Sequence, residues 1–96
     1  QFHTRETAPA AIECDLAICK DVMQHLPHFE REAIFARVKA KKWLLVNDFK
    51  EGVNPETRRG GNSPVDPACP PFRFKTVREV YRFPAGKTDK RAFLCW

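Results

Sequence analysis

Two dense apolar runs, each ended by polar residues, mark the middle of the chain. The first is residues 16–19 (LAIC) and the second is residues 43–49 (WLLVNDF). Short, continuously apolar runs are typical of strands covered on both faces, as in a parallel sheet. Between them Ile34 and Val38 stand four positions apart, which predicts a helix over residues 28–41. Strand, helix and strand in this order indicate a βαβ unit.

The rest of the chain follows other patterns. Residues 1–7 predict the end of a further strand, and residues 8–13 predict a loop. Residues 50–72 hold five prolines and three glycines, which predicts a long loop that is functional or disordered. Residues 77–83 and 91–96 are β-rich and joined by a short turn, so they predict a hairpin. The fold class is therefore α/β, a single domain over residues 1–96 with parallel strands followed by an antiparallel hairpin.

The number and distribution of charged residues limit which classes of function the chain could have. The 17 Lys and Arg residues exceed the 12 Asp and Glu residues, but they are spread along the chain. We therefore expect solvated basic faces and no nucleic-acid partner. One alternative stays open, because Arg73 and Lys75 alternate with Phe72 and Phe74, a mixture typical of surfaces that stack single-stranded bases. Packing of the two phenylalanines on the core is the other interpretation.

The four cysteines bear on compartment and metal binding. Cys14, Cys19, Cys69 and Cys95 show none of the two-residue spacings of zinc or redox motifs. We expect reduced thiols in an intracellular compartment, the cytoplasm being the simplest, and no metal site. No apolar run approaches the length of a membrane span, so no membrane association is expected.

Polar side chains follow both predicted parallel strands. Lys20 and Asp21 come directly after the first strand, and Asn47 and Asp48 end the second. In open α/β sheets ligands bind at the carboxyl ends of the strands, which meet at one rim. The pattern therefore predicts a pocket at that rim with apolar walls and a few polar groups.

Four segments, in this order, resemble class I S-adenosylmethionine-dependent methyltransferases. Residues 14–26 (CDLAICKDVMQHL) are similar to the fourth strand and following turn of that family, and residues 41–49 (KKWLLVNDF) resemble its fifth strand. Residues 60–72 (GGNSPVDPACPPF) are similar to a loop on the substrate side of some members. Residues 77–96 (VREVYRFPAGKTDKRAFLCW) resemble the closing hairpin, whose last strand runs antiparallel between its two neighbours.

The resemblance implies the later part of a Rossmann-like methyltransferase sheet, with the N-terminal half of the domain missing. The family's glycine-rich turn after the first strand, and its acidic residue after the second, have no counterpart in the chain. Residues 1–7 would then be the end of the third strand. A sheet cut in this way has an exposed edge, so we expect a homodimer or a partner subunit.

The resemblance also assigns the cofactor site. Glu6, with Thr7 beside it, would lie at the adenine of S-adenosylmethionine. Cys19 and Lys20 would occupy the turn whose backbone contacts the amino-acid end of the cofactor.

Three residues are the candidate bases: Asp21, His25 and Asp48. Asp21 has a second interpretation, as the cap of the following helix, and His25 has another, as a locally packed or hydrogen-bonded side chain. The implied reaction is in-line transfer of a methyl group to an unidentified acceptor, catalysed mainly by proximity, with an optional base. We expect the 96-residue chain by itself to be inactive. The alternative is an inactive split or degenerate half-domain that serves as a binding or structural subunit.

Overall fold

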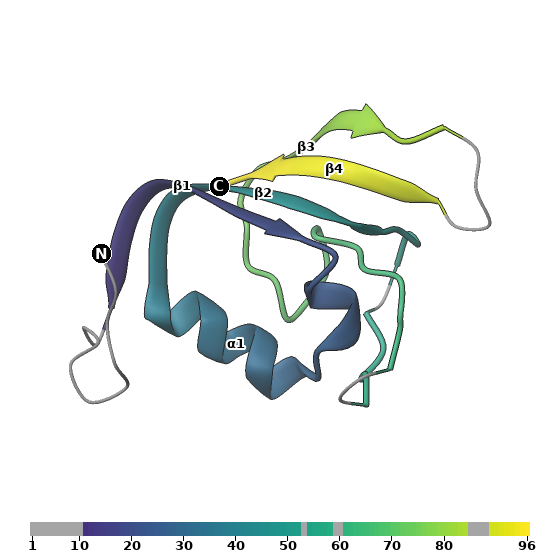
Figure 1. Cartoon of the computed structure of the whole chain (residues 1–96), viewed down its shortest axis with the longest axis horizontal. Coiled ribbons are helices and arrows are strands. Elements are labelled where there is room, and N and C mark those ends of the chain that lie inside the picture. The colour runs from purple at the N-terminus through teal and green to yellow at the C-terminus, as the bar shows by residue number, and fades with distance from the viewer. Residues whose placement is uncertain (1–10, 53, 59–60, 85–88) are drawn as a thin grey trace.

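The protein is a four-stranded mixed sheet with its helices and its long loop on one side. The computed structural model describes residues 11–52, 54–58, 61–84 and 89–96. The strands are β1 (Ile12–Lys20), β2 (Val38–Asp48), β3 (Val77–Arg82) and β4 (Lys90–Cys95). A 3₁₀ helix, η1 (Met23–His25), and a helix, α1 (His28–Arg37), connect β1 to β2. In Figure 1, η1, α1 and the loop between β2 and β3 all lie below the sheet.

The strand order is β1-β2-β4-β3. β1 and β2 are parallel, and β4 is antiparallel to both of its neighbours, β2 and β3. This confirms the α/β class, the parallel pair and the position expected for the last strand between two antiparallel neighbours. The strand predicted at residues 1–7 lies outside the described residues.

The core lies between the sheet and α1. Met23, Leu45 and Cys95 are fully buried at 0% exposure, and Phe35 of α1 packs edge-on against Trp43 with ring centroids 4.6 Å apart. Phe72 and Phe74 of the long loop each lie 5.6 Å from the Phe35 ring. These two phenylalanines therefore hold the loop on the core, as one interpretation of the sequence had it.

Two predicted boundaries are wrong. α1 ends at Arg37, not at residue 41, because β2 begins at Val38 and the side chains there alternate between half-buried Val38 and Ala40 and exposed Lys39 and Lys41. That alternation is the period of a strand, which outweighs the four-residue spacing of Ile34 and Val38. β1 begins at Ile12, inside the segment predicted as a loop. Among the described residues no helix is long and apolar enough to cross a membrane.

The prediction that the first apolar run is covered on both faces is also wrong. Cys19 is buried at 9% exposure, but Leu16 and Ile18 are 47% and 67% exposed. Successive side chains of a strand point to opposite faces. Because α1 lies on one side only, half of the run faces the uncovered side of the sheet (Figure 1).

Candidate functional site at the carboxyl ends of the parallel strands

The polar ends of β1 and β2 lie side by side, as the sequence predicted. Lys20 pairs with Val46 at the last rung of the parallel ladder, and the Asp21 N–H donates to the Val46 carbonyl over 2.8 Å. Asp21 therefore follows β1 at the point where Asn47 and Asp48 end β2. We call this group of residues, with Gln24 and His25, the rim.

Gln24 connects the two halves of the rim. Its Oε1 accepts a hydrogen bond of 2.8 Å from the backbone N–H of Asp48, and both residues are buried at 6% exposure. A buried amide that accepts such a bond ties the turn after β1 to the end of β2. Gln24 was not among the site residues predicted from the sequence.

Asp21 is held by an ion pair and does not cap a helix. Its Oδ1 lies 2.7 Å from Lys90 Nζ, and its backbone has φ 55°, a left-handed conformation that Asp tolerates better than most residues. The residue that precedes η1 is Val22, and no side chain caps that helix. The capping interpretation is therefore wrong, and the Asp21 carboxylate is neutralised by a neighbouring cation.

His25 makes its shortest hydrogen bond to the long loop and not within its own segment. Its Nδ1 lies 2.7 Å from the carbonyl oxygen of Gly61, so Nδ1 donates the proton. A Cβ added at Gly61 would lie 2.9 Å from the Arg58 carbonyl oxygen, so a side chain there would force the backbone to move. His25 thus fixes the long loop at a position that requires glycine.

Two further backbone hydrogen bonds attach the long loop to the rim. The Ser63 N–H donates to Gln24 O over 2.8 Å, and the Val65 N–H donates to Asp48 O over 2.7 Å. The loop expected to be functional or disordered is therefore a fixed wall along the rim.

Buried polar side chains hold the rest of this loop. Asn54, 4% exposed, donates to the Asp66 carbonyl over 2.8 Å and accepts from the Asp66 N–H over 2.6 Å. Arg31 of α1 is fully buried and donates to the Met23 carbonyl over 2.8 Å and to Thr57 Oγ1 over 3.2 Å. Burial lowers the pKa of Arg31, and the nearby charge of Glu56 acts in the opposite direction.

Asn47 is the unsatisfied group of the rim. It is 2% exposed, and its Oδ1 and Nδ2 have no hydrogen-bond partner among the described residues. A buried amide without partners is costly, and native proteins normally satisfy it with water or a ligand. Asn47 was noted from the sequence for its position at the end of β2, but the sequence gives no sign that it is buried.

The residues predicted to bind the cofactor differ in which of their atoms a ligand could contact. Cys19 is buried on the α1 side, and burial raises the pKa of its thiol, so its backbone is the part that remains for a ligand. Lys20 is exposed and makes no ion pair with a described carboxylate. Glu6 and Thr7 lie outside the described residues. In the described part of the chain no cluster of three or more metal-ligating side chains is present.

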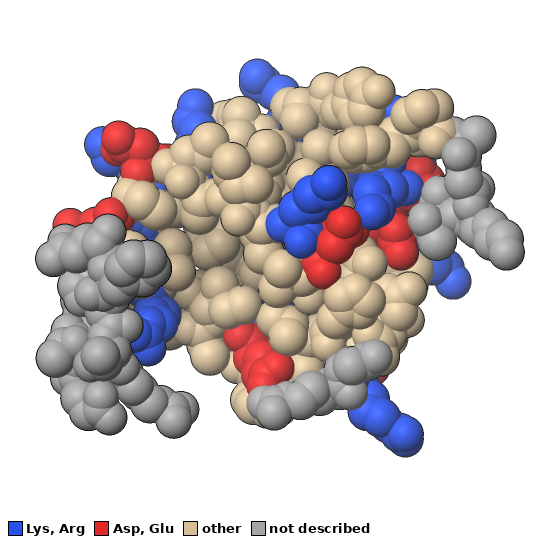
Figure 2. Space-filling model, viewed as in Figure 1, with Lys and Arg blue, Asp and Glu red and all other residues tan. Residues whose placement is uncertain are grey.

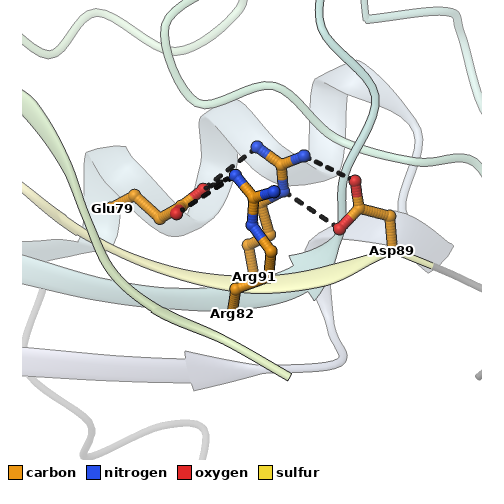
Figure 3. Close-up of polar contacts among 4 residues, drawn as sticks. All are labelled: Glu79, Arg82, Asp89 and Arg91. Atoms are coloured by element: carbon orange, nitrogen blue, oxygen red, sulfur yellow. Dashed lines mark hydrogen bonds and ion pairs between the residues drawn. The ribbon is translucent and has the colours of Figure 1, made fainter. Parts of the chain in front are cut away.

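An arginine network adjoins the rim at the end of the hairpin. Arg91 donates to both carboxylate oxygens of Asp89, over 3.0 and 2.6 Å, and to Glu79 over 3.0 Å, while Arg82 also donates to Glu79 (Figure 3). The hydrogen bonds from Arg91 lower the pKa of Asp89. In Figure 2, positive and negative side chains are interleaved on the face shown and form no block of one sign.

Three depressions in the surface of the described residues lie away from the rim. One of about 440 Å³ is lined by Phe35 and Lys39 on one side and by Pro71, Arg73 and Phe74 on the other. Lys39 pairs with Glu13 near the start of β1 and β2, so this depression is at the amino end of the parallel pair. None of the predicted site residues lines it, so the pocket expected at the rim stays a prediction.

Comparison of the chain with family models, with curated proteins and with solved structures found no match.

Proposed function

We propose that this chain forms the later part of an S-adenosylmethionine-dependent methyltransferase domain, and that methyl transfer takes place at the rim. The observation that carries the proposal is the sheet order β1-β2-β4-β3, with the last strand inserted antiparallel between two neighbours. It is the arrangement that the resemblance implied for the closing hairpin. The polar turn after β1 stands beside the end of β2, where open α/β sheets bind ligands.

The rim residues fit parts of such a cofactor. The cation of Lys20 has no described carboxylate partner and would meet the carboxylate of the cofactor's amino-acid end. The orphaned amide of Asn47 offers one donor and one acceptor for a bound polar group. When bound, the cofactor supplies an electrophilic methyl group.

Of the three candidate bases, Asp48 is the best placed. Asp21 is paired with Lys90, whereas His25 donates its Nδ1–H to Gly61 and has its Nε2 3.5 Å from Gln24 Nε2. The carboxylate of Asp48 makes no hydrogen bond or ion pair with another described side chain, while its backbone is fixed by Gln24. Asp48 would accept the proton that the acceptor loses as its lone pair attacks the methyl carbon, and His25 and Gln24 would be positioning residues.

The test is S-adenosylmethionine binding and turnover by the native protein at its natural length. We expect Asp48→Asn to lower kcat about 10²-fold or more while the dissociation constant of the cofactor stays unchanged. The matched control is Asp15→Asn, because the Asp15 side chain is 90% exposed, and it should change neither quantity. No cofactor binding, or equal losses in the two variants, would contradict the proposal.

The alternative, an inactive binding or structural subunit, is favoured by a different observation. β1 lies at the end of the sheet order, so its outer backbone edge is unpaired within the described residues. Such an edge is a template for pairing with another chain. A native protein that forms a stable complex through β1 but binds no S-adenosylmethionine would support this alternative over methyl transfer.

A further inference from the structure

Two adjoining depressions form a groove between α1 and the end of the long loop, which both lie below the sheet in Figure 1. The first holds about 440 Å³ and the second about 510 Å³. Both are lined by Glu32 of α1 and by Pro71 and Arg73 of the loop, so they adjoin. Four residues of α1, all on one side of the helix, line the groove: His28, Glu32, Phe35 and Ala36.

Two aromatic rings form the apolar part of the first depression. Phe35 and Phe74 are both half-buried, and their rings lie 5.6 Å apart at an angle of 83°. Phe72, which is buried, lies parallel to Phe74 at 12°, with ring centroids 6.2 Å apart. A partly exposed ring that its neighbours fix in this way is a platform on which the flat ring of a ligand stacks.

Opposite charges line the same depression without neutralising one another. Lys39 comes from the start of β2 and Arg73 from the loop, and neither makes an ion pair with a described carboxylate. Lys39 Nζ makes one long hydrogen bond, 3.4 Å, to the carbonyl oxygen of Phe35. Glu32 makes no ion pair with a described cation. The groove therefore offers two cations and one carboxylate to a ligand that carries an anion and a hydrogen-bond donor.

We propose that the groove binds a nucleotide whose base carries an exocyclic amino group, as guanine, adenine and cytosine do. The base stacks on Phe74, the phosphate meets Arg73 and Lys39, and the amino group donates to the Glu32 carboxylate. A carboxylate only accepts hydrogen bonds, so it selects a base that donates. The volume of the first depression is within the usual range of ligand pockets.

The groove divides the alternating segment Phe72 to Lys75, whose mixture of rings and cations is typical of surfaces that stack bases. Phe72 packs into the core, Arg73 and Phe74 line the groove, and exposed Lys75 does not line it. The groove is at the amino end of the parallel pair, whereas the rim is at the carboxyl end. The proposal is therefore independent of methyl transfer at the rim.

Titration calorimetry of the native protein with GMP and with IMP tests the proposal. IMP lacks the 2-amino group of GMP and is otherwise the same, so GMP should bind about tenfold or more tightly. Glu32→Ala should abolish this preference, because it removes the acceptor from an exposed helix position that tolerates alanine. Arg73→Gln should weaken both nucleotides by about tenfold, because both carry the phosphate.

The matched control is Lys75→Gln, which removes a cation close to Arg73 in the chain but outside the groove, and should change neither affinity. S-adenosylmethionine should not compete with GMP, because the two sites lie at opposite ends of the strands. Four results would overturn the proposal: no binding of GMP, equal affinities for GMP and IMP, equal effects of Arg73→Gln and Lys75→Gln, or competition by S-adenosylmethionine. Because GMP binding is measured without this cofactor, its failure is distinct from a failure of methyl transfer.

A short single-stranded RNA distinguishes the two sources of such a nucleotide. An affinity equal to that for GMP would assign the groove to a free mononucleotide. Binding about tenfold or more tightly than GMP, with an affinity that falls steeply as salt is added, would assign it to one nucleotide of an RNA chain.

Discussion

The two faces of the sheet differ more than their sequences do. On β1, Ala17 and Cys19 contact the core beneath the sheet, whereas Leu16 and Ile18, which are equally apolar, stand on the opposite side of the sheet, here called the outer face. The difference arises from the two-residue period of a strand and from α1 being on one side only. Burial in this protein is therefore decided by which layer is present, and not by the hydrophobicity of the residue.

The polar groups show the same asymmetry. On the α1 side Arg31 and Asn54 are buried with their hydrogen bonds made, and they hold the long loop. On the outer face Lys20, Lys42 and Arg78 have no described carboxylate partner. The described elements cover one face of the sheet and leave Leu16 and Ile18 of the other face exposed.

The rates at which the cysteine thiols react should show the largest of the differences that we expect. Burial raises the pKa of Cys95 to about 12, so at pH 8 its reactive thiolate is about a thousandfold scarcer than that of an ordinary thiol. We expect iodoacetamide to label Cys14, half-buried near the start of β1, well before Cys95. Peptide mapping by mass spectrometry after timed quenching measures the order, and the same protein in denaturant is the control. Labelling of Cys95 first would contradict the assigned core.

Truncation of a core residue should separate the faces by stability. Leu45→Ala removes a side chain of 0% exposure and should lower the free energy of unfolding by about 2–5 kcal/mol. Leu16→Ala removes the same atoms from the outer face, and in the isolated chain it should cost about 1 kcal/mol or less. Chemical denaturation of both variants gives the comparison. Similar losses would mean that the outer face is covered by the chain itself.

The buried arginine should matter more than its exposed counterpart on the same helix. Arg31→Met removes the bonds to Met23 O and Thr57 and leaves buried groups unpaired, at a cost of about 2 kcal/mol or more. Arg37→Met, at an exposed position of α1, should change the free energy of unfolding by about 0.5 kcal/mol or less. Hydrogen exchange should also show faster opening of residues 54–66 in the first variant only.

The smallest effect concerns the arginine network. Because Arg91 lowers the pKa of Asp89 in the folded state, the stabilisation is present above the unfolded pKa of Asp and is lost as the pH falls through the lower folded value. Asp89→Asn should therefore reduce the melting temperature slightly at pH 7, and the difference from the unaltered chain should shrink below about pH 4 and vanish below the lowered pKa of Asp89. A difference that persists in acid would mean that the carboxylate charge is not its cause.

The elements were largely predictable, and their ends were not. Apolar runs, the four-residue spacing of Ile34 and Val38 and a short turn indicated β1, β2, α1 and the hairpin, because each is a local pattern. The end of α1 was missed because residues 38–41 satisfy both periods. The uncovered face was missed because a continuous apolar run does not show which layers are present.

The sequence predicted only that the candidate site lies at the ends of two parallel strands, and not the contacts within it. That Asp21 and Asp48 lie at one rim follows from the parallel pair, but the attachment of His25 to Gly61 joins residues 36 positions apart. Arg31 and Asn54 look like surface residues in the sequence, and nothing local indicates that they are buried. Such contacts depend on how the long loop folds back, which no short window of sequence contains.

Ultraviolet cross-linking of radiolabelled S-adenosylmethionine to the native protein, followed by peptide mapping, tests the central claim most directly. The account predicts label within residues 19–25 or at residues 47–48, in competition with unlabelled cofactor. Label confined to the depression between α1 and residues 71–74, or no competed label at all, would contradict a methyl-transfer site at the rim.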